Sequence, residues 1–182
     1  MGQALSIEPE NIDFARVFED ICPTLAQRVQ NPGVEFQKDN PYSVFRTCVD
    51  KGRLQQVFTN FVTNAVKYTD EGHIRIGYRA EDREQNGKTQ TGLYIYCEDT
   101  GTGIPLDKQS SVFDRFVKLN DTVQGTGLGL SICKTIAERC GGVIGLHSDG
   151  LGHGSTFWMW IPCSVEYKEK EVTPSSRDSA DE

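Results

Sequence analysis

The longest amphipathic pattern in the chain runs from Arg53 to Thr69. At about 100° per residue, its apolar side chains fall on one stripe, which predicts a helix that packs against a core. This apolar stripe consists of Leu54, Val57, Phe58, Phe61, Val62 and Ala65. A second stripe beside it carries two amides and an ammonium group, from Asn60, Asn64 and Lys67 at positions i, i+4 and i+7.

The polar stripe has two interpretations. Asparagine is a poorer helix former than alanine or glutamate, so its use twice on one helix edge needs a reason. An amide oxygen is a hard ligand that suits Mg²⁺, and a lysine ammonium group suits phosphate. The alternative is an ordinary solvated face, and the pattern of this helix alone does not decide between them.

The residues before this helix predict one more helix and two short strands. Apolar residues recur at helical spacing from Asn11 to Val29, and Pro23 is expected to kink or divide that helix. Residues 34–36 and 43–49 have the apolar content of short strands. Asp50 then stands where the N-cap of the long helix is expected.

The residues after the long helix predict a hairpin. His73–Ala80 alternates apolar and charged residues, as a half-buried strand does, and Leu93–Cys97 is a second apolar run. The polar segment Glu81–Thr91 between them is expected to be a loop, and it contains the hairpin-type turn Asn86-Gly87. We therefore expect the two strands to be antiparallel neighbours.

The second strand ends at Asp99, which is followed by Gly101 and Gly103. A carboxylate at a strand end is a common place for a specific polar contact, and Asp99 could accept a hydrogen bond from an exocyclic amine such as that of adenine. The two glycines would let the backbone bend sharply and approach a ligand. The alternative is an ordinary Asp-Gly turn.

A second glycine-rich segment contains Gly125, Gly127 and Gly129 and leads into an apolar helix that ends at Gly141-Gly142. Backbone N–H groups exposed at such a helix N-terminus, together with the positive end of the helix dipole, suit phosphate. The GxGxG spacing after a loop differs from the dinucleotide-binding fingerprint, and no Gly-Lys-Ser/Thr follows as in a P-loop.

The chain length suits one domain with a substantial core. Residues 143–148 and 155–161 are expected to be the closing strands of this domain, which we place at residues 1–165. Residues 166–182 are polar and charged almost throughout, so we expect a disordered tail or linker there.

Composition and charge exclude several classes of function. The formal net charge of −7 argues against nucleic acid or an acidic membrane surface as the main partner. No apolar run approaches the roughly 18 residues of a membrane span, and no signal peptide is visible. The six cysteines include no CxxC pair, and histidines with ligand spacing are absent, so a reducing, cytoplasmic setting is the simplest inference. A disulfide framework is the alternative.

Five short motifs together resemble the ATP-binding catalytic domain of sensor histidine kinases, in the GHKL superfamily. In chain order they are an asparagine box (NFVTNAVKYT), a glycine box (DTGTGIP), a phenylalanine box (FDRF), a second glycine box (GTGLGLSI) and a weaker last one (GHGSTF). Each motif is modest alone, whereas five in order over roughly residues 10–163 are specific. The resemblance implies an α/β fold of the Bergerat type, an α+β two-layer sandwich with helices on one face of a mixed sheet of about five strands.

The resemblance also implies roles for the matching residues. Asn64 would bind Mg²⁺, and Asn60 would lie beside it at the phosphates of ATP. Lys67 and Tyr68 would contact phosphate and flank the adenine, while Asp99 would accept a hydrogen bond from the adenine amine.

Residues 106–126 would form a mobile lid, in which Arg115 and Lys118 approach the phosphates. Asn60, Lys67 and Arg115 are the implied catalytic residues. The other implied ATP-binding positions are Gly101, Gly103, Ile104, Gly125, Thr126, Gly127, Leu128, Gly129, Leu130 and Thr156, of which Thr156 would support the adenine site.

A histidine kinase phosphorylates a histidine on a helical dimerisation domain. None of His73, His147 and His153 lies on a predicted helix with an acidic neighbour, so the acceptor is expected outside this chain. The expected partners are the dimerisation domain of the parent kinase and, indirectly, a response regulator. The parent is expected to be a membrane-anchored sensor whose catalytic domain lies in the cytoplasm.

Two other functions remain open at this point. The chain could be a nucleotide-binding module that regulates without phosphoryl transfer, or a GHKL ATPase that hydrolyses ATP. The hydrolysing relatives carry a glutamate four residues before the metal-binding asparagine, where this chain has Asn60. That difference favours the kinase.

Overall fold

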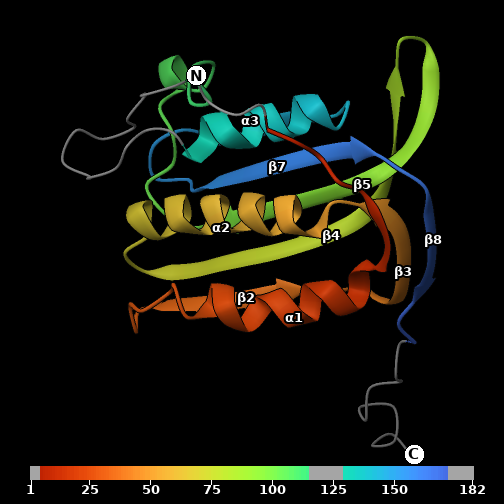
Figure 1. The fold of residues 1–182 in the computed structure, drawn as a ribbon. Coiled ribbons are helices and arrows are strands. Elements are labelled where there is room, and N and C mark those ends of the chain that lie inside the picture. The colour runs from red at the N-terminus through yellow and green to blue at the C-terminus, as the bar shows by residue number, and fades with distance from the viewer. Residues whose placement is uncertain (1–4, 115–128, 172–182) are drawn as a thin grey trace, which may run out of the picture.

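The computed structural model describes residues 5–114 and 129–171, in which three helices lie across one face of a five-stranded sheet (Figure 1). The helices are α1 (Phe14–Ala26), α2 (Lys51–Tyr68) and α3 (Gly129–Arg139), and a short 3₁₀ helix, η1, spans Leu106–Lys108. This arrangement confirms the predicted two-layer α/β fold. None of the helices within these ranges is long and apolar enough to cross a membrane.

The large sheet has the strand order β2-β4-β5-β7-β6. Its strands are β2 (Val34–Asp39), β4 (Gly72–Gln85), β5 (Lys88–Asp99), β6 (Val143–His147) and β7 (Ser155–Pro162). Strand β2 runs parallel to β4, and every other neighbouring pair is antiparallel. The sheet is therefore mixed, as predicted, and β5 lies at its centre.

A second, three-stranded sheet was not predicted. It has the order β1-β3-β8, with β1 (Glu10–Asp13) and β8 (Val165–Glu169) both antiparallel to the central β3 (Tyr42–Val49). In Figure 1, β3 and β8 run side by side at one end of the larger sheet.

The prediction of a disordered tail is wrong for the first residues of the segment 166–182, because β8 extends to Glu169. Strand β8 pairs with β3, and Val165 packs partly against the core, while the side chain of Tyr167 is half exposed. The ring of Tyr167 lies 5.0 Å from that of Tyr42 and 6.2 Å from that of Phe45, centroid to centroid. Backbone pairing and these ring contacts hold β8 as an edge strand, and residues 172–182 lie outside the described ranges.

Helix α1 is shorter than the predicted segment from Asn11 to Val29. It begins at Phe14 because Asp13 adopts an extended conformation and caps the helix, its Oδ1 accepting a 3.2 Å hydrogen bond from Ala15 N–H. Pro23 lies inside the helix and does not divide it. The buried side chain of Leu25 holds the turn after Pro23 against the core.

Helix α2 has the predicted amphipathic form. Its N-cap is Asp50, whose Oδ1 accepts a 3.1 Å hydrogen bond from Arg53 N–H. The whole apolar stripe of this helix is buried, with Phe61 lying against Phe157 of β7 at a ring separation of 5.8 Å. Burial of the apolar stripe fixes the rotation of α2 and therefore the direction in which the polar stripe faces.

The hairpin of β4 and β5 turns at Asn86 and Gly87, which have φ angles of 52° and 78°. These positive angles are those of the predicted hairpin-type turn. The strands extend up to this turn, so most of the segment 81–91 is strand, and the prediction of a loop there is wrong.

The polar residues of this hairpin form strands because they interact across the helix-free face of the sheet. The guanidinium carbon of Arg79 lies 4.1 Å from the ring centroid of Tyr94, and that of Arg83 lies 4.4 Å from the ring of Trp158. Glu81 forms ion pairs with both arginines, at 3.0 and 2.7 Å. The two arginine–ring contacts run between strands, whereas the ion pairs of Glu81 lie along β4, and both kinds of contact stabilise a strand whose sequence is polar.

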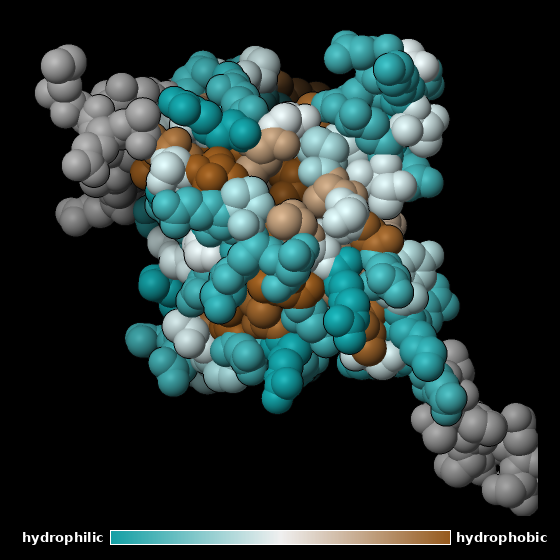
Figure 2. Space-filling view, turned by 45° about the vertical axis from the view of Figure 1, so that its right-hand side comes forward, coloured by the Kyte–Doolittle hydropathy of each residue, from teal (hydrophilic) through white to brown (hydrophobic). Residues whose placement is uncertain are grey.

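The surface of the domain is mixed. In the space-filling view (Figure 2), patches of hydrophobic residues alternate with hydrophilic ones on the face shown.

All six cysteines lie within the described ranges, and all six are free thiols. The alternative of a disulfide framework is therefore not supported.

Candidate nucleotide-binding site

The polar edge of α2 lies beside the start of α3. Asn60 Nδ2 donates a 3.1 Å hydrogen bond to the carbonyl oxygen of Gly129, the first residue of α3, and lies 3.7 Å from Cys133 Sγ. The polar edge is thus not simply a solvated face at this position. Asn60 connects the asparagine box to the second glycine box.

Asn64, one turn further along α2, differs from Asn60. Its Nδ2 atom is buried and has no hydrogen-bond partner within the described residues. An unpaired buried amide is unfavourable by about 1–3 kcal/mol, so its retention favours a ligand that completes its contacts. The unpaired atom is an N–H donor, so the ligand that completes its contacts is an acceptor such as a phosphate oxygen. Mg²⁺ would be held by the other end of the amide, the oxygen Oδ1, so the residue type at this position fits the predicted metal ligand.

Asp99 lies at the end of β5 with only 4% of its surface exposed. Its Oδ1 accepts a 2.9 Å hydrogen bond from Gly101 N–H, and its Oδ2 accepts a 2.8 Å hydrogen bond from the Ser155 hydroxyl. Desolvation by burial raises the pKa of Asp99, while these two hydrogen bonds act in the opposite direction. The carboxylate is therefore held in one orientation and not solvated as in a surface Asp-Gly turn.

The loop after Asp99 packs backbone to backbone against the loop 148–154. Gly154 N–H donates to Gly101 O at 3.1 Å, and Gly152 N–H donates to Thr102 O at 2.6 Å. A Cβ atom on Gly103, whose φ is 76°, would lie 2.1 Å from Gly150 O. Glycine is required here because the two loops leave no room for a side chain.

The same loop also contacts the C-terminal end of α2. Thr102 N–H donates a 2.9 Å hydrogen bond to Tyr68 O, and a Cβ atom on Gly101 would lie 2.1 Å from that oxygen. Lys67 is exposed beside it. The last turn of α2 and the first glycine box therefore meet, which places Lys67 and Tyr68 near Asp99.

Thr156 does not lie where the resemblance implied. Asp99 pairs in register with Ser155, whereas Thr156 pairs with Glu98 on the next position of both strands. Because side chains alternate along a strand, Thr156 faces the opposite side of the sheet from Asp99. Ser155 is the residue that contacts Asp99, so the prediction was one residue out of register.

Ile104 and Leu130 were also predicted at the nucleotide. The Ile104 side chain is only 1% exposed and belongs to the hydrophobic core, as Leu130 partly does. Any contribution of Ile104 to binding therefore comes through its backbone or its packing. Gly129 begins α3, as predicted.

The remaining predicted site residues are not described by the structure. These are Arg115, Lys118, Gly125, Thr126, Gly127 and Leu128, and most of the predicted lid at 106–126 lies with them outside the described ranges. Within the described residues, no group of three or more histidine, cysteine or acidic side chains is arranged to hold a metal ion.

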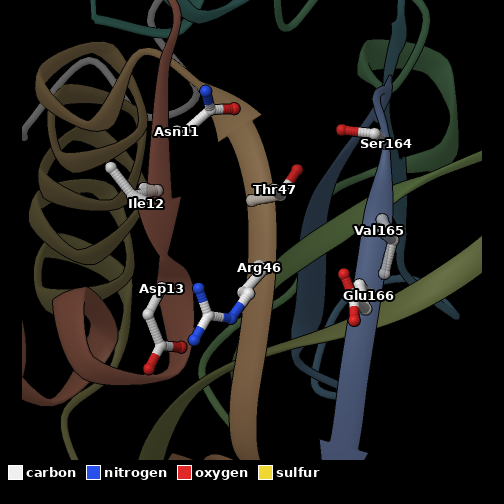
Figure 3. A pocket seen from close by; sticks show the side chains of 8 residues that line it. All are labelled: Asn11, Ile12, Asp13, Arg46, Thr47, Ser164, Val165 and Glu166. Carbon is white, nitrogen blue, oxygen red and sulfur yellow. The ribbon is translucent and has the colours of Figure 1, made fainter.

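Two hollows are found on the described part of the molecule. One, of about 330 Å³, lies beside the loop 148–154 and is lined by Asp99 and Ser155 among others, but by no residue of α2. Another, of about 530 Å³, lies along the small sheet, where Arg46 of β3 points toward Asp13 (Figure 3). Neither hollow contains the polar edge of α2, so the first includes only the Asp99 end of the predicted nucleotide site and the second includes none of it.

Comparison with known proteins decides the family. The sequence profile described as "Histidine kinase-, DNA gyrase B-, and HSP90-like ATPase" matches residues 49–165, which include α2, Asp99 and both glycine-rich loops around it. The chain belongs to this family. The match confirms the family that the five motifs predicted.

Among curated relatives, the adaptive-response sensory kinase SasA of Synechococcus elongatus is 33% identical over 163 residues. That alignment covers 88% of this chain and 40% of SasA. The chain thus spans less than half the length of this relative, which leaves the rest of such a kinase outside the comparison.

Solved structures of histidine kinases have the same fold. Full-length ShkA in complex with AMPPNP matches with a TM-score of 0.72 and 25% identity, over 91% of this chain and 33% of ShkA. The catalytic domain of histidine kinase ThkA matches with a TM-score of 0.63 and 26% identity, over 85% of this chain and 97% of that domain. The chain therefore corresponds to a single catalytic domain of a histidine kinase.

Proposed function

We propose that this chain is the ATP-binding catalytic domain of a two-component sensor histidine kinase. It binds Mg·ATP and transfers the γ-phosphoryl group to a histidine on a dimerisation domain. The proposal rests mainly on one observation: a buried, doubly hydrogen-bonded Asp99 beside a helix edge that carries the unpaired amide of Asn64.

Asp99 selects adenine in this proposal. A carboxylate accepts a hydrogen bond from the exocyclic amine of adenine, whereas guanine presents a carbonyl oxygen at that position. Repulsion between two oxygen acceptors therefore adds to the loss of one hydrogen bond. Gly101 and Gly103 shape the backbone beside Asp99, since each lies too close to neighbouring backbone for a Cβ atom.

Asn64, Lys67 and Arg115 act at the phosphates. Asn64 would hold Mg²⁺, which when bound neutralises phosphate charge in the transition state. Lys67, exposed at the end of α2, supplies a positive charge on the same helix edge. Backbone N–H groups around Gly129 at the start of α3 supply further donors to phosphate.

Asn60 favours transfer to histidine over hydrolysis. Hydrolysis needs a group that positions or deprotonates water, and a neutral amide cannot accept a proton at pH 7. The Asn60 amide also already donates to Gly129 O. A neutral imidazole nitrogen is itself a nucleophile, so its phosphorylation depends mainly on positioning and on charge neutralisation.

The partners follow from this reaction. The domain acts on a dimerisation domain of its parent kinase and, through it, on a response regulator. In this proposal, the catalytic domain works in the cytoplasm on a membrane-anchored parent.

A transfer assay tests the function directly. The chain is incubated with Mg·ATP and a dimerisation domain that carries an acceptor histidine, and with the same domain in which that histidine is replaced by glutamine. Phosphate that is acid-labile and appears only on the histidine form supports the kinase. Binding of a non-hydrolysable ATP analogue without any transfer would instead favour a regulatory nucleotide-binding module.

A further inference from the structure

Both backbone hydrogen-bonding groups of Ile104 are taken by side chains. Ile104 N–H donates a 3.1 Å hydrogen bond to the Ser148 hydroxyl, and Ile104 O accepts a 2.9 Å hydrogen bond from Gln109 Nε2. The Ile104 side chain is buried in the core. Ile104 directly follows the loop 99–103. It is therefore held by hydrogen bonds at its N–H and C=O groups and by core packing at its side chain.

Gln109 and Ser148 also contact each other. Gln109 Nε2 donates a second hydrogen bond, of 3.1 Å, to the carbonyl oxygen of Ser148. The three residues thus form a closed triangle, which we name the Ile104 clamp. Both hydrogens of the Gln109 amide are used in it, and only a primary amide offers two donors in this geometry.

Ser148 extends the clamp into the neighbouring loop. Its hydroxyl donates to Gly154 O at 2.7 Å and lies 3.3 Å from Gly150 N–H, and only 7% of the residue is exposed. Gly154 in turn donates to Gly101 O. One serine therefore connects Ile104 to both ends of the loop 150–154, and through Gly154 to the loop that carries Gly101.

The clamp lies on the segment that leads away from the nucleotide site. Gln109 follows η1, and three residues later Val112 is buried with 2% of its surface exposed. The ring of Phe113 stands edge-on to Phe157 at 6.1 Å. Residues 104–113 are thus attached to the core, and Gln109 is the polar contact that joins them to the glycine loops.

We propose that Gln109 and Ser148 are positioning residues for nucleotide binding. Neither needs to touch the nucleotide: each acts through Ile104, holding the loop 99–104 in the shape in which Gly101 N–H meets Asp99 Oδ1. The inference rests on the proposed nucleotide-binding function. If the clamp served fold stability alone, its loss would lower the melting temperature and leave the affinity of the folded protein unchanged.

An isosteric series at Gln109 separates these two roles. Gln109→Met keeps the size of the side chain without its donors, and Gln109→Glu places a carboxylate against two carbonyl oxygens. We expect affinity for a non-hydrolysable ATP analogue, measured by calorimetry, to fall about tenfold for methionine and further for glutamate. The melting temperature of the nucleotide-free methionine variant should stay close to that of the unmodified protein.

Matched controls use exposed residues of the same type. Gln90→Met lies on the exposed hairpin, and Ser164→Ala is exposed just before β8, and both positions lie outside the predicted nucleotide site. Neither control should change nucleotide affinity. Hydrogen exchange of the nucleotide-free protein should quicken at residues 104–112 in Gln109→Met and remain unchanged in Gln90→Met.

A double-mutant cycle tests whether the clamp acts as a unit. Because Gln109 and Ser148 hold the same residue, combining Gln109→Met with Ser148→Ala should weaken binding by less than the product of the two single effects. Independent effects, or variants that bind like the controls, would overturn the inference while the proposed function stands. If the unmodified protein binds no adenine nucleotide, the proposed function fails first and the inference fails with it.

Discussion

Ser155 and Asp99 face each other across the β5–β7 strand pair, and the Ser155 hydroxyl donates a 2.8 Å hydrogen bond to Asp99 Oδ2. Gly101 N–H donates a 2.9 Å hydrogen bond to the other carboxylate oxygen, Asp99 Oδ1. Two donors on two oxygens fix the orientation of a carboxylate that is almost completely buried. This arrangement gives Asp99 a defined direction for recognition and also a raised pKa, since burial disfavours its charged form.

We predict that Asp99→Asn weakens ATP binding and reduces discrimination against GTP. A hydrogen bond to a charged acceptor contributes about 1.5–3 kcal/mol, so affinity for ATP should fall by roughly tenfold or more. Calorimetry with non-hydrolysable ATP and GTP analogues measures both effects. Equal binding of the two nucleotides by the unmodified protein would contradict the assignment of Asp99.

The same substitution should leave the fold stable or make it more stable at neutral pH. The pKa of Asp99 is higher in the folded than in the unfolded state, so its contribution to stability is present below its ordinary pKa and is lost as pH rises through the folded value. The melting temperature of Asp99→Asn should therefore equal or exceed that of the unmodified protein at pH 7. Any gain in melting temperature over the unmodified protein should become smaller as the pH is lowered. Asp82→Asn, on the exposed part of β4, should show no such trend.

Asn64→Ala should abolish the dependence of nucleotide binding on Mg²⁺. The variant removes an amide whose nitrogen has no partner among the described residues, and alanine is a better helix former, so the protein should fold as stably as before. Titrations with and without EDTA measure the metal dependence, and Gln55→Ala on the exposed side of α2 is the control. Unchanged affinity for Mg·ATP in the folded variant would exclude Asn64 as the metal ligand.

The chain alone should hydrolyse ATP very slowly. Asn60 cannot act as a base, and its amide is committed to Gly129 O. The measurement compares steady-state phosphate release with phosphorylation of an added dimerisation domain. Rapid multiple-turnover hydrolysis without an acceptor, lost in Asn60→Ala, would favour the ATPase alternative.

Gly103→Ala should be much more destabilising than Gly87→Ala. Both glycines have positive φ, 76° and 78°, so both substitutions impose the left-handed strain of roughly 1–2 kcal/mol. A Cβ atom at position 87 meets nothing within 4 Å, whereas at position 103 it would lie 2.1 Å from Gly150 O. The difference between the two free energies of unfolding, from denaturant titrations, measures the contact between the loops. Equal effects would mean that the loops separate easily.

The elements that carry local patterns were predictable from the sequence. The apolar stripe of α2 fixes both the helix and the direction of its polar edge, and the Asn86-Gly87 turn fixes the hairpin. The outer part of that hairpin was missed because Arg83 is stabilised by the ring of Trp158 on β7, a contact that a local pattern does not contain. The small sheet was missed for a related reason: β1 and β8 are short, and their partner β3 is distant in sequence.

The site was predicted at the level of motifs and less well at the level of single residues. Asp99 is buried and held by two hydrogen bonds, and Asn64 has a buried amide nitrogen without a partner among the described residues, while the roles of both stay predictions. Ser155 was missed in favour of Thr156, because only the strand register shows which of two adjacent residues faces Asp99. Ser148 and Gln109 were missed because their partners are backbone atoms, and a sequence does not show which carbonyl groups a side chain will reach.

The small sheet also determines how the domain carries mechanical load. Strand β1 begins opposite Val49 at one end of β3, and β8 ends opposite Tyr42 at the other. Tension between the residues that precede β1 and those that follow β8 would therefore load both strand pairs in shear, parallel to the strands, with all their hydrogen bonds sharing the force. Because that line of force runs through β3 and not through β5 or β7, pulling on the two flanks would leave the strands that hold Asp99 and Ser155 unstretched.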